Sequence, residues 1–160
     1  MGLGIEELLR LLDESFGKRA WHGTNLRGAL RGLDQKQASL RPNPGRHNIW
    51  EIAVHCAYWK YAVRRRITGA KRGSFAYPGS NWFVKPGKPG SNSWKQDVAI
   101  LKAEDRLLRE VVATLPPGRL TELSPRKKWT LAETVMGAAF HDVYHAGQIQ
   151  LLKRLQERSR

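Results

Sequence analysis

The chain has 160 residues, of which 28 are Lys or Arg and 14 are Asp or Glu, so its formal net charge is +14 at pH 7. This length suits one domain with a sizeable core, and residues 1–160 are expected to form a single domain. Its only cysteine, Cys56, excludes an intramolecular disulfide. We find no apolar run of the roughly 18 residues that span a bilayer and no basic-then-apolar leader, so we expect a soluble cytoplasmic protein without membrane contacts.

The excess of basic residues permits nucleic-acid binding or the attraction of anionic ligands. These residues are dispersed in short runs such as 64–66, 71–72, 126–128 and 153–154. Dispersion favours a solvated basic surface over a specific nucleic-acid interface. A basic nucleic-acid-binding or damage-response protein with structural histidines is the alternative function.

Helical periodicity begins near the N-terminus. Apolar residues recur on one side of an amphipathic segment from about Ile5 to Phe16, and 25–33 is expected to form a further short helix. Two prolines and a glycine at 42–45 then break the pattern. The first predicted long helix therefore ends well before the next one begins.

Capping boxes mark the starts of three longer helices. Each begins after a polar residue that is followed, three positions later, by Glu or Gln: Asn48, Ser93 and Thr130. The first of these helices ends near Gly69, and the second ends at the breaker cluster 116–118. No alternating strand pattern of useful length occurs. The sequence therefore predicts an all-α fold, a four-helix bundle.

The stretch from about 70 to 92 is rich in glycine and proline and contains four aromatic residues: Phe75, Tyr77, Trp82 and Phe83. A connection longer than about 12–15 residues is rarely a mere turn. An extended chain gains roughly 3.3 Å per residue. This stretch is therefore long enough to run back along the helix that begins after Asn48, which would be about 30 Å long. The long helices before and after this stretch, the second and third of the bundle, are thus expected to run parallel. The crossover has three candidate roles: packing alone, walling a pocket, or a base-stacking surface.

Two histidines, His141 and His145, lie four residues apart in the last predicted helix. At this spacing the Cβ atoms are roughly 6 Å apart on one face, so both imidazoles can bind one ion. The candidate third ligand is His55, which shares an apolar helical stripe with Ile52 and Trp59. An unpaired buried polar group costs about 1–3 kcal/mol, and a shared metal ion would satisfy all three rings. Alternatively, they are core histidines bonded to backbone or water.

Two motifs contain these histidines and, together with a third near the N-terminus, cover essentially the full length: Trp50…His55…Trp59 and His141-Asp142-Val143-Tyr144-His145-Ala146-Gly147-Gln148-Ile149. In these motifs the chain resembles the DinB-like (YfiT-like) superfamily of bacterial four-helix bundles, and Trp21-His22-Gly23 before Leu26 is similar to one branch of it. The resemblance implies an up-down-down-up bundle and frequent homodimers. It also implies a three-His site for Ni, Zn or a similar divalent ion, with His55, His141 and His145 at the ligand positions. Some members of the superfamily are bacillithiol- or mycothiol-dependent transferases or isomerases, and others resemble hydrolases.

Three neutral imidazoles leave an open coordination position, which is typical of a catalytic metal site. Three neighbouring residues are candidates for supporting roles: Asp142, Gln148 and Tyr144. For Asp142, a helix-dipole or surface pairing is favoured over contact with a ligand imidazole or the general-base role of His-Glu-X-X-His. Gln148 either orients a metal-bound water or packs, and Tyr144 either lines the cavity or packs. Cys56 points about 100° away from His55 and is expected to be a small buried residue.

An open three-His site suits activation of water or of a thiol, for a small-molecule substrate. No carboxylate base stands beside the ligands in the sequence, which weakens hydrolysis because a general base contributes about 10²–10⁴-fold. A metal deprotonates a bound thiol, and the positive charge would attract the carboxylates of a low-molecular-weight thiol. The sequence thus slightly favours a thiol-dependent transferase over a hydrolase. A homodimer is expected because so many aromatic side chains are hard to bury in one small bundle.

Overall fold

The computed structural model describes residues 3–88, 92–124 and 128–158, and its regular structure in these ranges is entirely helical. The elements in chain order are α1 (Ile5–Phe16), α2 (Leu26–Ala29), α3 (Gln35–Ser39), α4 (Ile49–Thr68), α5 (Trp94–Ala113), the 3-10 helix η1 (Pro117–Thr121) and α6 (Leu131–Arg158). Two isolated β-bridges, at 20–23 and 123–130, are the only β pairing in the described ranges. The prediction of an all-α protein is confirmed.

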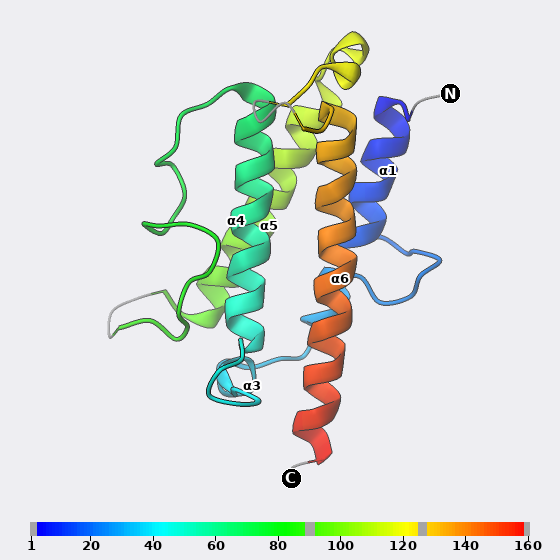
Figure 1. Cartoon of the computed structure of the whole chain (residues 1–160). Coiled ribbons are helices and arrows are strands. Elements are labelled where there is room, and N and C mark those ends of the chain that lie inside the picture. The colour runs from blue at the N-terminus through cyan, green and yellow to red at the C-terminus, as the bar shows by residue number, and fades with distance from the viewer. Residues whose placement is uncertain (1–2, 89–91, 125–127, 159–160) are drawn as a thin grey trace.

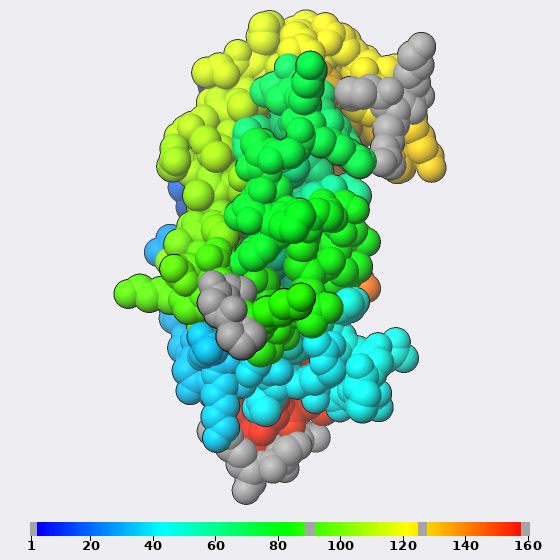
Figure 2. All heavy atoms as spheres, turned by 90° about the vertical axis from the view of Figure 1, so that its left-hand side faces the viewer, coloured from blue at the N-terminus to red at the C-terminus, as the bar shows by residue number. Residues whose placement is uncertain are grey.

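The four long helices α1, α4, α5 and α6 lie side by side (Figure 1). In that view α1 and α6 run downwards, whereas α4 and α5 run upwards. The parallel course of α4 and α5 is also visible in their contacts: Trp50 near the start of α4 donates to Asp97 near the start of α5, and Arg64 farther along α4 pairs with Glu104. Segment 70–92 has no regular secondary structure where it is described, and it covers α4 on one side of the molecule (Figure 2).

The long helices begin where local hydrogen bonds satisfy their free N–H groups. The Asn48 side chain accepts a 2.8 Å bond from the Glu51 N–H at the start of α4. At the start of α6, the Glu133 carboxylate accepts a 2.7 Å bond from the Thr130 N–H. Gly69 ends α4 with a φ of 73°, a left-handed conformation that costs glycine little. The capping signals read from the sequence are confirmed at these ends.

The helix α1 is held by its apolar face. Leu8 and Leu12 are buried in a cluster with Leu108 and Val112 of α5 and Val135 of α6. Burial of one leucine side chain contributes roughly 1.5–3 kcal/mol, so this contact is enough to fix a twelve-residue helix against α5 and α6.

A buried ion cluster joins α4, α5 and α6. Lys60 of α4 is 1% exposed, and its Nζ lies 2.8 Å from Asp105 Oδ1 of α5 and 2.5 Å from Asp142 Oδ2 of α6. Burial alone would lower the pKa of Lys60, but the two carboxylates outweigh it and raise that pKa. Burial raises the pKa of Asp142 to about 6, although the Lys60 ammonium opposes the shift. One ammonium thus neutralises only in part the buried carboxylate of Asp142 and the partly buried carboxylate of Asp105.

None of the helices in the described ranges combines the length and the hydrophobicity needed to cross a lipid bilayer.

Replacement of the central ammonium should be strongly destabilising. We expect Lys60→Met to lower the free energy of unfolding by about 3–5 kcal/mol, because it leaves the buried carboxylate of Asp142 without its counter-charge. The exposed Lys102 of α5 provides the matched control, and Lys102→Met should change stability by less than about 0.5 kcal/mol. Urea unfolding at pH 7 measures both, and equal losses in the two variants would contradict the assignment.

Candidate metal centre

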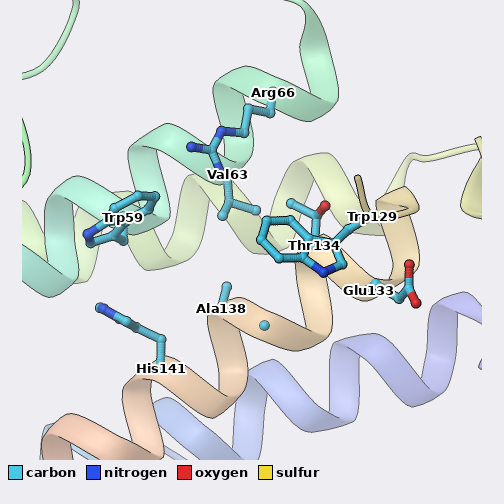
Figure 3. A pocket seen from close by; sticks show the side chains of 9 residues that line it. Trp59, Val63, Arg66, Trp129, Glu133, Thr134, Ala138 and His141 are labelled. Carbon is cyan, nitrogen blue, oxygen red and sulfur yellow. The ribbon is translucent and has the colours of Figure 1, made fainter. Parts of the chain in front are cut away.

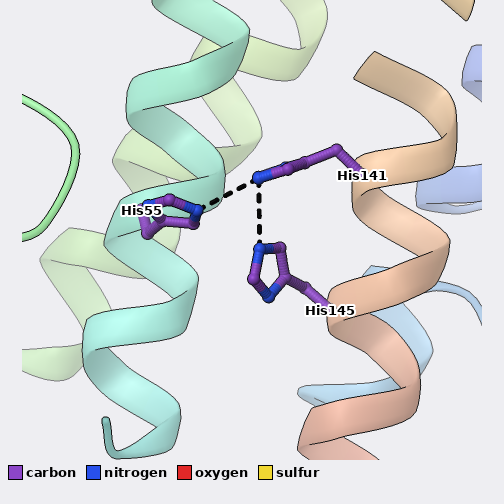
Figure 4. A group of neighbouring side chains, drawn as sticks. All are labelled: His55, His141 and His145. Carbon is purple, nitrogen blue, oxygen red and sulfur yellow. Dashed lines mark hydrogen bonds between the residues drawn. The ribbon is translucent and has the colours of Figure 1, made fainter. Parts of the chain in front are cut away.

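Three imidazoles meet between α4 and α6 (Figure 4). His55 Nε2 lies 3.0 Å from His141 Nε2, and His145 Nε2 lies 3.1 Å from the same atom. His55 and His145 are about 5% exposed, whereas His141 is partly exposed. The structure therefore brings together the three histidines that the sequence singled out, as a group that could hold a metal ion.

The hydrogen bonds of the outer ring nitrogens orient this group. His55 Nδ1 donates to the Asn81 carbonyl at 2.9 Å, and His145 Nδ1 donates to Gln148 Oε1 at 2.7 Å. In the neutral rings, the Nε2 atoms of both then present lone pairs to His141. His141 Nε2 carries at most one hydrogen, which can satisfy only one of the two.

A cation at the meeting point would satisfy all three rings, and imidazole suits Zn, Ni, Cu and Fe ions. Tetrahedral bonds of 2.0–2.1 Å would separate the nitrogens by about 3.3–3.4 Å, only slightly more than the two separations observed. By both its donors and its dimensions, the group fits a divalent metal ion.

The electrostatics keep these rings in the form that binds metals. Burial lowers the pKa of His55 to about 4, although the hydrogen bond that its ring donates to the Asn81 carbonyl opposes the shift. Burial, together with His145 and His55, lowers the pKa of His141 to about 3, and burial also lowers the pKa of His145. All three imidazoles are neutral at pH 7, and only a neutral imidazole is a ligand.

The crossover segment supports His55 from outside the helices. Besides its carbonyl, Asn81 uses its side-chain oxygen, which accepts from Trp59 Nε1 at 2.9 Å; its φ of 68° is a left-handed value that asparagine tolerates. Trp82 stacks between the rings of His55 and His47, with centroid distances of 3.7 Å and 3.6 Å. Both faces of Trp82 are covered, so this ring offers no surface on which a base could stack.

Three residues after Trp82, Lys85 anchors the crossover to the starts of α4 and α5. Lys85 is 3% exposed, and its carbonyl accepts a 2.6 Å bond from Asn48 Nδ2. Its N–H donates to Glu51, and its ammonium pairs with Asp97 at 2.9 Å. Sequence reasoning missed both Asn81 and Lys85. Nothing in their local sequence indicated contacts with α4 and its N-cap, whose contacting residues lie 22 to 37 positions earlier.

Gln148 and Tyr144 form a short chain of contacts behind His145. The Gln148 oxygen holds the His145 ring, and its Nε2 donates to the Tyr144 hydroxyl at 3.0 Å. The Tyr144 ring packs edge-on against His145 and is 63% exposed. Gln148 therefore orients an imidazole of the centre, while Tyr144 lines the adjoining cavity.

Asp142 is not where the sequence suggested. The expected surface pairing is wrong, because Asp142 is 1% exposed and faces Lys60 in the interior. Its Oδ1 has no hydrogen-bond partner in the described chain, and none of the described bonds joins Asp142 to an imidazole of the centre. Cys56 is fully buried as expected, and burial raises the pKa of its thiol. Cys56, His141 and Asp142 also lie close together, but a protonated thiol and a carboxylate engaged by Lys60 are poor ligands.

Two cavities adjoin the centre. The first, of about 260 Å³, is lined by His141 and reaches towards Trp129; we name it the Trp129 cavity (Figure 3). The second, of about 370 Å³, is lined by His145 and reaches towards Arg46; we name it the Arg46 cavity. Ligands in these cavities would approach the imidazoles from different sides.

The sequence model of the DinB superfamily matches residues 19–149. The chain belongs to the DinB superfamily. The matched range contains all three histidines of the centre and the crossover segment that supports His55. The resemblance noted in the sequence is thereby confirmed. No curated protein and no solved structure gives a significant match to the chain.

Neutral buried histidines predict a loss of stability in acid. The pKa of His141 lies below that of an unfolded histidine, so the unfolded state binds more protons, and stability falls as the pH drops below about 6.5. Between pH 7 and pH 5, His141 should account for about 2 kcal/mol of lost stability in metal-free protein.

The comparison of variants isolates this contribution. Urea unfolding with a chelator present, at pH 7 and pH 5, should show a smaller acid loss for His141→Gln than for wild type. The exposed His22 serves as the control, and His22→Gln should behave as wild type. An unchanged acid loss in His141→Gln would show that this ring is not held neutral.

Proposed function

We propose that this member of the DinB superfamily is a divalent-metal-dependent enzyme, with His55, His141 and His145 as ligands of a Ni or Zn ion. The observation that carries the proposal is the convergence of the three Nε2 atoms, of which two present lone pairs to the third. A core histidine cluster without an ion would leave one of these buried lone pairs unsatisfied, at a cost of about 1–3 kcal/mol.

Bound there, the ion would supply Lewis-acid activation of water or of a thiol. The chain's own residues hold the ligands in place: the Asn81 carbonyl fixes the ring of His55, and Gln148 fixes that of His145. Trp59 and Trp82 pack against His55 and limit the access of water to its ring. Such outer contacts set ligand orientation and basicity, and their loss typically weakens metal binding about 10–100-fold.

We favour thiol transfer over hydrolysis, because the described carboxylates near the centre take part in ion pairs or capping bonds elsewhere. Asp142 pairs with Lys60, and Glu51 pairs with Arg41. Glu133 accepts the capping bonds of Thr130. A free general base is worth about 10²–10⁴-fold in hydrolysis, whereas a metal-bound thiol is already deprotonated. The proposed cosubstrate is a low-molecular-weight thiol, and the proposed location is the cytoplasm, where such thiols stay reduced.

The fold that we propose for the chain is one domain with the up-down-down-up arrangement of four helices that the superfamily resemblance implies. The directions of α1, α4, α5 and α6 in Figure 1 support this assignment. Charge alone suggests nucleic-acid binding as the alternative function. No contact around the crossover aromatics of the described chain favours it, since Trp82 is covered on both faces.

Metal content tests the proposal. After loading with zinc or nickel and removal of free ion, wild type should retain about one ion per chain. His55→Ala and His145→Ala should bind the ion at least about a hundredfold more weakly, since each loses a direct ligand. His22→Ala is the control, because His22 is exposed and outside the cluster. Equal metal content in all four proteins would refute the site.

The same proteins test the reaction. Metal-loaded wild type and His22→Ala should conjugate a chlorinated nitroaromatic compound to bacillithiol or mycothiol, and His55→Ala should not. Ester and amide substrates are assayed in parallel. Metal-dependent ester cleavage without thiol conjugation would assign hydrolysis in place of transfer.

We also propose that the protein is a homodimer. Large apolar side chains are exposed along one helix of the described chain, α6: Phe140 at 56%, Tyr144 at 63%, Leu151 at 59% and Leu155 at 47%. A second copy could cover this surface, although the net charge of +14 opposes association. Sedimentation should give the dimer mass, and Leu151→Glu should shift it to the monomer. Ala99→Glu, at an exposed position of α5, is the matched control; a monomer mass for wild type would disprove the dimer.

A further inference from the structure

We propose that the centre holds two different small molecules at once: an apolar aromatic compound in the Trp129 cavity and a carboxylate-bearing compound in the Arg46 cavity. The inference rests on the proposed function, which it deepens by naming the ligand class on each side of the three histidines.

The Trp129 cavity is built for an apolar ring. Trp59 and Trp129 contribute flat aromatic walls, and Val63 and Ala138 contribute aliphatic ones. In Figure 3, Trp59 and His141 lie at one end of the cavity and Trp129 at the other. A dry apolar cavity of about 150 Å³ admits benzene, so about 260 Å³ admits a larger, substituted ring.

The charged residues at this cavity do not make it a site for ions. The Glu133 carboxylate is held by the helix cap at Thr130. The Arg66 guanidinium lies over the Trp59 ring, 5.3 Å from its centroid. Both charges are thus occupied at the rim, and the interior presents aromatic and aliphatic carbon to a ligand that reaches His141.

The Arg46 cavity has a different chemistry. Arg46, His47, Tyr144 and Gln148 form its polar wall beside apolar residues such as Leu152, and none of its lining residues is an Asp or Glu. Among the described residues, no carboxylate forms an ion pair with the Arg46 side chain. A cation without a counter-charge, beside a phenol hydroxyl and an amide, suits a ligand that carries a carboxylate.

The geometry permits simultaneous binding. The two cavities share no lining residue, and His141 lines the first whereas His145 lines the second. His55 stands between them, with Trp59 of the first cavity and Trp82 of the second packed against its ring. Two ligands can therefore reach one centre from separate sides, as a transfer reaction between two substrates requires.

Two glycines of α6 provide a matched pair of variants for the aromatic side. A Cβ at Gly137 or at Gly147 would meet no other atom within 4 Å, and both positions are exposed. Gly137 lines the Trp129 cavity, whereas Gly147 lines neither cavity. Gly137→Leu should fill the cavity without straining the fold, and Gly147→Leu makes the same change elsewhere on the helix. Both substitutions favour the helix, because glycine is a poor helix former.

The anionic side is tested with Arg46→Gln, and Arg10→Gln is the control, since Arg10 is exposed on α1 and lines neither cavity. The probes are 4-nitrobenzyl alcohol, a neutral aromatic compound, and succinate, a dicarboxylate. Each is titrated by calorimetry into the full chain, metal-free and zinc-loaded, alone and with the other probe at saturation.

Gly137→Leu should weaken binding of the alcohol at least about tenfold and leave succinate unchanged, with Gly147→Leu as wild type. Arg46→Gln should weaken succinate about fivefold and leave the alcohol unchanged, with Arg10→Gln as wild type. Saturation with one probe should change the Kd of the other by less than about twofold, because the two cavities share no lining residue and neither ligand displaces the other.

Competition between the probes would overturn the inference. Equal affinities of Gly137→Leu and Gly147→Leu for the alcohol, or of Arg46→Gln and Arg10→Gln for succinate, would also overturn it. Zinc content, measured on the same samples, separates it from the proposed function. Normal probe binding without zinc retention would refute the metal centre and leave the two cavities standing. Zinc retention with competing probes would do the reverse.

Discussion

The position of one buried ammonium constrains much of this structure. Lys60 lies five residues after His55 on α4, and its partner Asp142 directly follows His141 on α6. The same ammonium pairs with Asp105, so one charge fixes the relative positions of three helices beside the three imidazoles. A buried ion pair adds little net stability, but leaving one partner unpaired is costly. The Lys60 cluster therefore specifies the register of these helices, because another register would leave its charges unpaired.

The crossover segment completes what the helices leave open. A histidine on a helix can turn about its side-chain bonds, and the Asn81 carbonyl and the Trp82 ring restrict His55 to one orientation. The anchoring of Lys85 to Glu51 and Asp97 transmits the rigidity of the two helix starts to this loop. The long connection is therefore part of the centre, and it walls the Arg46 cavity through Trp82.

The surroundings of the three histidines are strongly asymmetric. On the His141 side the walls are aromatic and aliphatic, and on the His145 side they carry a cation and hydrogen-bonding groups. The described carboxylates nearby are engaged by lysine, arginine or a helix cap. Acidic side chains would therefore not offset the positive charge of an ion bound there. That charge would then attract an anionic ligand more strongly.

The sequence by itself determined the helical class, the helix starts and the shared face of His141 and His145. These features depend on hydrogen bonds and spacings within three or four residues, which the local pattern contains. His55 could be selected as their partner from its apolar stripe and the family resemblance. The tertiary structure alone decided that Asp142 is buried against Lys60, and that Asn81 and Trp82 hold His55. Asp142 is 82 positions from Lys60, and Asn81 is 26 positions from His55. Contacts over such separations depend on how whole helices pack and where the crossover runs.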